Sequence, residues 1–281
     1  MKRFTFISFL LTLTLSGTSH ASCTQKTTDS TVDSTGTHTL KYDDVSVTWI
    51  QDNAQQKNMP AGLFPQEARR VIDSLGMSEK GIPSTISTFL VQTHGKNILF
   101  DTGLGLPDSQ LLPTLKLLKI SPDDIQYVFL THFHDDHIGG LINSSGETVF
   151  KHAQLYAPQA EYNGWMKAPK NQRTQIEKII SVYKDRLHLF TYTDTLPAGI
   201  KPMEAAGHTP GHTVYRIGRF LITGDLVHGA ALQIPHPEFC ASYDQQPDEA
   251  ISTRRRVLDY IRQHHLIMAG MHLPAPAFWQ P

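Results

Sequence analysis

Histidine and aspartate side chains are concentrated in one short segment of this sequence. His132, His134, Asp136 and His137 follow an apolar run at the spacing H-x-H-x-D-H, just before two glycines. In an extended chain, residues i and i+2 point to the same side, so His132 and His134 can hold one metal ion. A turn then brings Asp136 and His137 to a second ion. Imidazole and carboxylate ligands without a thiolate suit Zn²⁺, with Mn²⁺, Fe²⁺ or Co²⁺ as rivals. The segment therefore predicts a site for two ions per chain.

Three later segments supply further ligands of the same kinds. His208 lies on a turn before a predicted strand, Asp225 ends a strand at Thr-Gly-Asp, and His272 follows the last predicted strand. Side chains that flank different strands can meet at one edge of a sheet. We therefore expect these three residues to join the first segment in one site.

Short apolar runs and turn signals alternate along the chain from about residue 40 onward, with no second linker. Runs rich in β-branched and aromatic residues predict strands, and apolar residues near the 3.6-residue period predict helices. The predicted strands are 45–50, 85–93, 97–101, 126–131, 148–157, 187–191, 213–217, 220–223 and 266–269, and the predicted helices are 66–75, 109–119, 171–184 and 247–264. This mixture predicts a single α/β domain over residues 41–281. Residues 22–40, which carry hardly any apolar side chains, predict a flexible leader.

The first 21 residues have the pattern of a secretory signal peptide. Lys2 and Arg3 precede a run dominated by apolar side chains, and small residues lead up to Ala21. We therefore expect a periplasmic or secreted protein. No later stretch approaches the length of a membrane span. Export permits a disulfide, and the sequence leaves open whether Cys23 and Cys240 pair.

The charge balance argues against a nucleic-acid partner. The chain has 25 Lys and Arg residues against 26 Asp and Glu residues, which gives a net charge of −1 at pH 7. Nucleic-acid-binding domains usually carry a clear cationic excess. The small number of cysteines, two in all, excludes a disulfide-rich scaffold and a cysteine-based zinc module.

The ordered motifs resemble the metallo-β-lactamase superfamily, in particular its binuclear hydrolase branch. H-x-H-x-D-H, then Gly-His, Gly-Asp and a late histidine occur in that family's order, and Asp101-Thr102-Gly103 looks like its D-T-G strand end. The resemblance covers residues 42–272 and implies a four-layer αβ/βα sandwich. It also implies the ligand sets: His132, His134 and His208 for one metal, Asp136, His137 and His272 for the other, and Asp225 as the bridge between them.

Within that branch, residues 224–228, 230–233 and 252–256 look most similar to methyl parathion hydrolase-like enzymes and N-acyl-homoserine lactonases. Two features differ from that group. Its lactonases often carry a tyrosine three residues after the bridging aspartate, where this chain has His228. Only nine residues follow His272, from which we expect the terminal strand to be absent.

The resemblance implies an exported binuclear zinc hydrolase that uses a metal-bridging hydroxide to open ester bonds. Its implied substrates are small esters or lactones, such as N-acyl-homoserine lactones, with phosphotriesters as a side activity. Asp136 would orient the hydroxide and protonate the leaving alkoxide, and His228 is the second candidate catalytic residue. A thioester hydrolase similar to glyoxalase II and a non-catalytic metal-binding protein of the same fold are the alternatives. A homodimer is left open.

Other polar residues near the motifs have supporting roles or none. We expect Asp101 and His212 to contact metal ligands rather than ions. The run of three arginines at residues 254–256 predicts a solvated face of the last helix.

Overall fold

The computed structural model describes residues 37–53 and 58–281. The predicted signal peptide, Cys23 and most of the predicted leader lie outside the described residues. The leader prediction is wrong at its end, because Thr37–Tyr42 is a strand, β1, that pairs antiparallel with β2 (Val45–Gln51). This strand is rich in threonine and only partly buried, so it carries a weak apolar signal. Within the described ranges, no helix is long and apolar enough to cross a membrane.

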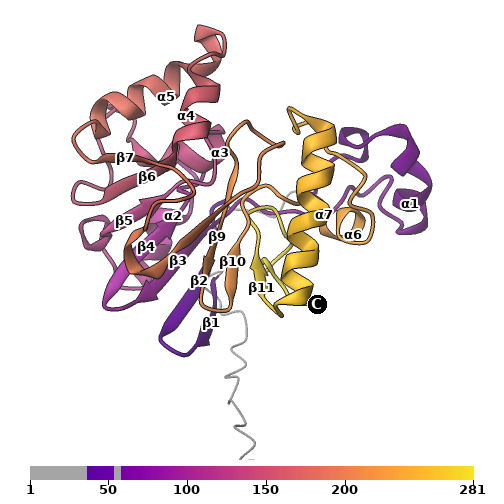
Figure 1. Cartoon of the computed structure of the whole chain (residues 1–281), viewed down its shortest axis with the longest axis horizontal. Helices are drawn as coiled ribbons and strands as arrows, with labels where there is room; N and C mark the ends of the chain where they lie inside the picture. Colours follow the sequence, from indigo (N-terminus) through magenta and orange to yellow (C-terminus); the bar gives the residue numbers. More distant parts are fainter. Residues whose placement is uncertain (1–36, 54–57) are drawn as a thin grey trace, which may run out of the picture.

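Seven strands form the first sheet, and their order in space is their order along the chain (Figure 1). Neighbouring strands pair antiparallel from β1 to β4 and parallel from β4 to β7. The remaining members are β3 (Ser87–Thr93), β4 (Lys96–Phe100), β5 (Tyr127–Phe129), β6 (Gln154–Pro158) and β7 (Leu187–Phe190).

Successive residues of this sheet enter two different cores. Phe89 and Phe100 pack in the core shared with the second sheet, whereas their neighbours Leu90 and Leu99 pack with helices on the outer face. Side chains alternate between the two faces of a strand, so a sheet covered on both faces needs apolar residues at nearly every position. This requirement explains the continuous apolar runs in the sequence.

The second sheet has the strand order β12-β11-β10-β9-β8. Its members are β8 (Lys201–Glu204), β9 (Thr213–Ile217), β10 (Phe220–Ile222), β11 (Ile267–Ala269) and β12 (Phe278–Trp279). The expectation that a terminal strand is absent is wrong, because β12 pairs antiparallel with β11. A strand of two residues is too short to show the alternation from which strands are predicted.

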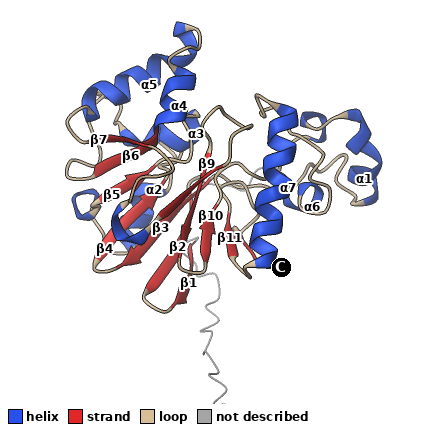
Figure 2. Ribbon diagram, viewed as in Figure 1, coloured by secondary structure: helices blue, strands red, loops and turns tan. Residues whose placement is uncertain are grey.

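Helices cover the outer faces of both sheets and complete the four-layer αβ/βα sandwich (Figure 2). Helices α2 (Leu111–Leu117) and α5 (Lys170–Tyr183) pack on the first sheet, and α7 (Pro247–Gln263) packs on the second. The shorter helices are α1 (Arg69–Ser74), α3 (Asp135–Ile138), α4 (Gln159–Trp165) and α6 (Ala230–Gln233). The α/β class and the single domain predicted from the sequence are therefore observed.

The arginine run on α7 does not lie on one solvated face. Arg254 is only 1% exposed, whereas Arg255 and Arg256 are exposed. Position 254 lies four residues after the buried Ala250 and four before the buried Leu258, which places it on the inner side of the helix. The prediction for residues 254–256 is thus wrong at its first member.

Candidate metal centre

The predicted ligands stand at strand ends from both sheets. Strand β5 of the first sheet is followed by α3, which carries Asp136 and His137. In the second sheet β10 and β11 are parallel, and β9 runs antiparallel to β10. The ends of β10 and β11 and the start of β9 therefore lie at the same edge. Asp225 follows β10, His272 follows β11, and His208 precedes β9.

One group of ligand atoms consists of three imidazole nitrogens and a carboxylate oxygen. His132 Nε2 and His208 Nε2 each lie 3.0 Å from His134 Nδ1. Asp225 Oδ2 lies 3.2 Å from His208 Nε2 and 3.8 Å from His132 Nε2. Because zinc ligands sit roughly 2.0–2.2 Å from the ion, atoms this close together can share one ion.

A second group lies on the other side of Asp225. His137 Nε2 is 3.0 Å from Asp225 Oδ1, and His272 Nε2 is 3.1 Å from Asp225 Oδ2. Asp136 completes this group, with its carboxylate oxygens 3.7 Å from His137 Nε2 and 3.4 Å from His272 Nε2. The Asp225 carboxylate thus touches both groups, as a bridging ligand would.

Backbone and carboxylate acceptors hold three of these histidines in one orientation. His137 donates through Nδ1 to Asp101 at 2.7 Å, His208 donates through Nδ1 to Asp244 at 3.0 Å, and His272 donates through Nδ1 to the Thr85 carbonyl at 2.8 Å. Each Nε2 is left with its lone pair facing the site, which is the tautomer that binds a metal. Asp101 has the supporting position that the sequence predicts.

Asp244 is held in turn by the buried arginine of α7. Arg254 donates to Asp244 Oδ2 at 2.7 Å and to the carbonyls of Leu226 and Pro237 at 2.8 Å each. Burial disfavours the charge on Asp244, but the hydrogen bond from His208 and the charges of the neighbouring histidines and Arg254 outweigh it and hold the pKa of Asp244 well below its usual range. Helix α7 therefore supports the predicted ligand His208 through an ionised aspartate.

His212 supports the bridging residue instead of an ion. Its Nδ1 donates to the Ala205 carbonyl, and its Nε2 accepts from the backbone N–H of Asp225, both at 3.0 Å. The residue directly before Asp225 must be small, because a Cβ on Gly224 would lie 2.6 Å from His212 Nε2 and 2.8 Å from the Thr131 Cβ. The supporting role predicted for His212 matches this arrangement.

Glu161, on α4, joins two ligand loops that are far apart in sequence. Oε1 of this fully buried carboxylate accepts from the Phe133 N–H at 2.9 Å and from Trp165 Nε1 at 2.6 Å. Oε2 accepts from Thr209 Oγ1 and from the Gly211 N–H, both at 2.8 Å. Phe133 lies between two predicted ligands, and Thr209 follows a third, so Glu161 fixes the loops relative to each other. Burial raises its pKa, against these hydrogen bonds.

His228 lies inside the site as a further imidazole. Its Nε2 is 3.2 Å from Asp225 Oδ2, and its ring stacks on His272 with centroids 5.3 Å apart. It is only 1% exposed, yet it lines the cavity described below. Burial lowers the pKa of His228, which favours a neutral imidazole next to the predicted ligands.

Burial and the carboxylates shift the pKa values of the site histidines in opposite directions, and the carboxylate of Asp225 stays ionised. Burial lowers the pKa of His132 well below its usual range and that of His134 to about 3. Burial would lower the pKa of His208 too, but the carboxylates of Asp225 and Asp244 outweigh it and raise that pKa to about 9. Burial disfavours the charge on Asp225, yet the surrounding histidines lower its pKa well below its usual range. The carboxylates of Asp225 and Asp244 therefore stay charged and attract cations.

Buried polar atoms without partners indicate what these residues hold. Among the described residues, His137 Nε2, Asp225 Oδ1 and both ring nitrogens of His228 are buried and make no hydrogen bond. Leaving such atoms unpaired is costly, and a cation between the two ligand groups would satisfy them. The donor atoms are imidazole nitrogens and carboxylate oxygens without a thiolate. The residues thus fit two divalent ions, for which zinc is well suited.

A cavity of about 460 Å³ opens onto this centre. Asp136, His228 and His272 line it together with Met59 and Tyr243. Cavities of roughly 300–1,000 Å³ are typical of small-molecule sites, so a small substrate can reach the predicted ligands from this side.

The structure brings together every residue that the sequence predicts as a ligand, and their function as ligands stays a prediction. Sequence reasoning missed Asp244 and Glu161. Neither lies in a recognisable motif, and Glu161 belongs to a short helix that the sequence does not predict. Arg254 was named but assigned to the surface.

The comparisons with known proteins agree with this geometry. Residues 81–267 match the model of the metallo-beta-lactamase superfamily. A lactamase-like protein, aptB, of Emericella nidulans is 47% identical over 55 residues, 20% of this chain and 18% of that protein. The matched segments of the first curated relatives cover 18% to 28% of those proteins.

Solved structures match over most of the chain. The dizinc quorum-quenching lactonase AidC, in complex with a product, N-hexanoyl-L-homoserine, has a TM-score of 0.79 and 25% identity, covering 86% of this chain and 92% of that one. The hydrolase AbOPH of the beta-lactamase superfamily has a TM-score of 0.77 and 28% identity, covering 87% of this chain and 92% of that one.

Proposed function

The chain belongs to the metallo-beta-lactamase superfamily, and from this premise we propose that it is an exported two-metal hydrolase that opens lactones. N-acyl-homoserine lactones are the proposed substrates, and phosphotriesters a side activity. The observation that carries the proposal is the Asp225 carboxylate between two groups of ligand atoms at the floor of a small cavity. The similar lactonase with a bound product supports the choice of substrate. Export rests on the sequence of residues 1–21 alone.

The reaction follows from the positions of the polar groups. Two divalent ions bound by these residues would polarise the ester carbonyl and acidify a water molecule. Asp136 is partly exposed and lines the cavity, so its carboxylate can orient the attacking water and take up its proton. After the carbonyl carbon–oxygen bond of the ring breaks, the same group returns the proton to the leaving alkoxide. His228 can donate to the oxygen that gains negative charge.

A substrate panel tests the proposal. The protein is loaded with Zn²⁺ or Mn²⁺ and given lactones of varied acyl length, an aryl ester, a thioester and a phosphotriester. We expect the highest kcat/KM on a lactone, loss of turnover after chelation, and recovery when the metal returns. A thioester as the preferred substrate would favour the glyoxalase II-like alternative, and two bound ions without any turnover would favour a metal-binding protein.

Replacing Asp136 by Asn tests the proton-transfer step. The amide can still face the site but cannot accept the proton, so we expect kcat to fall by about 100-fold while the metal content falls much less. Elemental analysis and kinetics on one preparation give both numbers. Equal losses in turnover and in bound metal would show that Asp136 acts only as a ligand.

A further inference from the structure

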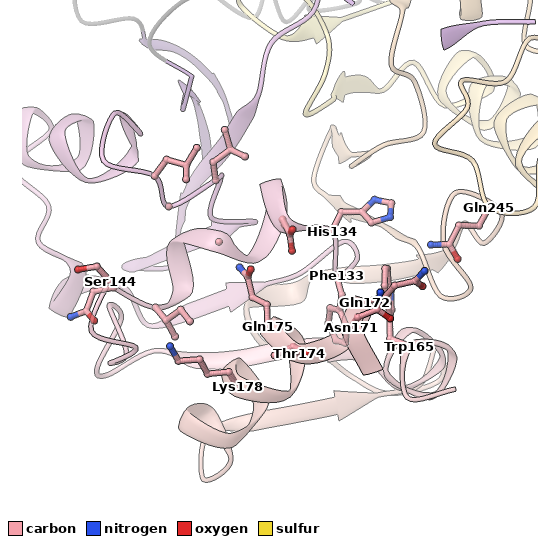
Figure 3. Close-up of a pocket in the computed structure, with 17 residues that line it drawn as sticks. Phe133, His134, Ser144, Trp165, Asn171, Gln172, Thr174, Gln175, Lys178 and Gln245 are labelled. Atoms are coloured by element: carbon pink, nitrogen blue, oxygen red, sulfur yellow. The ribbon is translucent and has the colours of Figure 1, made fainter. Parts of the chain in front are cut away.

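A second and larger cavity lies beside the metal centre. It encloses about 910 Å³, and His134 lines both cavities. The loop that follows α6 also reaches both, because Tyr243 lines the cavity over the metal ligands and Gln245 lines the larger one. In Figure 3, His134 and Gln245 stand at one end of this groove, and Ser144 and Lys178 stand at the other. The groove therefore leads away from the predicted metal ligands.

One side of helix α5 faces the groove with polar side chains. The lining residues Asn171, Thr174, Gln175 and Lys178 lie three, four and seven positions apart, so they share one face of the helix. The other side buries Ile176, Ile179 and Tyr183 in the core of the first sheet. Asn171, Thr174 and Lys178 are exposed and Gln175 is half-buried, and this polar face lines one cavity with Leu104 and Ile142.

Side-chain amides along the groove are available for a ligand. Gln172, Gln175 and Gln245 line it, and because Gln172 and Gln245 are exposed and Gln175 is half-buried, a ligand in the groove can reach their side-chain amides. Each amide offers two donor hydrogens and an acceptor oxygen. Asp135 and Lys178 are the acidic and basic lining residues, so their charges balance. These features match an uncharged ligand with its own donors and acceptors.

The end of the groove nearest the ligands contains a fixed aromatic ring. Trp165 lines the groove, and its indole N–H donates to the buried Glu161 at 2.6 Å. Its ring meets that of His134 edge-on, with centroids 5.6 Å apart. A chain leaving the metal centre would pass this ring before it reaches the amides of α5.

We propose that this groove binds the part of the substrate beyond the scissile ester, and that this part is an uncharged chain bearing hydroxyl or amide groups. The inference rests on the proposed lactone hydrolysis and specifies its substrate class. A bare alkyl chain would remove water from the amides of α5 without replacing their hydrogen bonds, which lowers affinity.

The test uses three γ-lactones. One has no side arm, one has an acylamino arm with a plain alkyl chain, and one has an arm of equal length with several hydroxyl groups. With the metal-loaded wild type we expect kcat/KM to be about 10-fold higher for the hydroxylated lactone than for the alkyl one. In the variant Gln172→Leu/Gln175→Leu we expect that preference to disappear through KM, with the lactone that has no arm unaffected.

The matched control is Gln263→Leu, the same change at an exposed site on α7, where all three rates should stay unchanged. Calorimetric binding of the ring-opened products gives the same ranking without turnover. If no lactone is hydrolysed, the proposed function fails, but a tighter hydroxylated product would still support the groove. Equal binding of the alkyl and hydroxylated products, or a variant that weakens both alike, would overturn the inference.

Discussion

Replacing Asp225 by Ala is expected to reduce hydrolysis by at least about 1,000-fold and to lower the number of bound ions per chain. The carboxylate contacts His208 and His272 within 3.2 Å through one oxygen and His137 at 3.0 Å through the other. Its removal takes a ligand from both predicted ions at once and removes the negative charge that lies between the two groups of ligand nitrogens. The loss of metal lowers the rate, and the loss of charge stabilisation in the transition state lowers kcat by a further factor of about 100 to 1,000.

Metal content by elemental analysis and kcat on the preferred lactone measure this effect. Asp259→Ala is the control, because Asp259 is 63% exposed on α7 and pairs with Arg262 at the surface. If the Asp225 variant kept two ions per chain and a rate within tenfold of the wild type, the bridging role would be wrong.

Replacing Glu161 by Ala is expected to cost about 3–5 kcal/mol of unfolding free energy, the second large effect. The change leaves the N–H groups of Phe133 and Gly211 buried without an acceptor, and each such group costs about 1–3 kcal/mol. It also frees the loops that carry His134 and His208. Since partners of metal ligands typically affect affinity by about 10- to 100-fold, the affinity for the ion at this group should fall within that range.

Denaturant unfolding of the metal-free protein measures the loss of unfolding free energy without any contribution from bound metal. Competition with a chelator measures the loss of metal affinity. Glu177→Ala is the control, since this half-exposed residue pairs with Arg173 on α5 and should change stability by less than about 1 kcal/mol. A smaller loss is expected for Glu161→Gln, which keeps one acceptor oxygen. If neither stability nor metal affinity changed in the alanine variant, Glu161 would not position these loops.

The ligand positions could be predicted from the sequence because metal chemistry restricts both residue type and spacing. His132 and His134 have to alternate on an extended segment, and Asp225 has to end a strand, so each leaves a recognisable local pattern. The strands with long apolar runs were predictable for a similar reason, since both faces of the first sheet are buried. The predicted strand 148–157 is longer than the observed β6, which begins at Gln154.

The supporting residues were harder to predict because their roles depend on contacts between distant segments. Asp244 contacts His208, 36 positions away, and Glu161 contacts Gly211, 50 positions away. No local pattern marks either residue. Arg254 is different, since the buried positions 250, 257, 258 and 261 of α7 place it on the inner face. Its charge and its two arginine neighbours concealed that signal.

The predicted ligands come from both sheets of the sandwich, and this has a consequence for the whole molecule. His132 and His137 belong to the half with β5, whereas Asp225 and His272 belong to the half with β10 and β11. Ions bound between them would connect the two halves at one edge of the sandwich. Metal binding and the stability of the folded domain are therefore thermodynamically linked. Linkage is reciprocal. A substitution that weakens packing in the core shared by the two sheets, far from any predicted ligand, would therefore also lower the affinity for the ions.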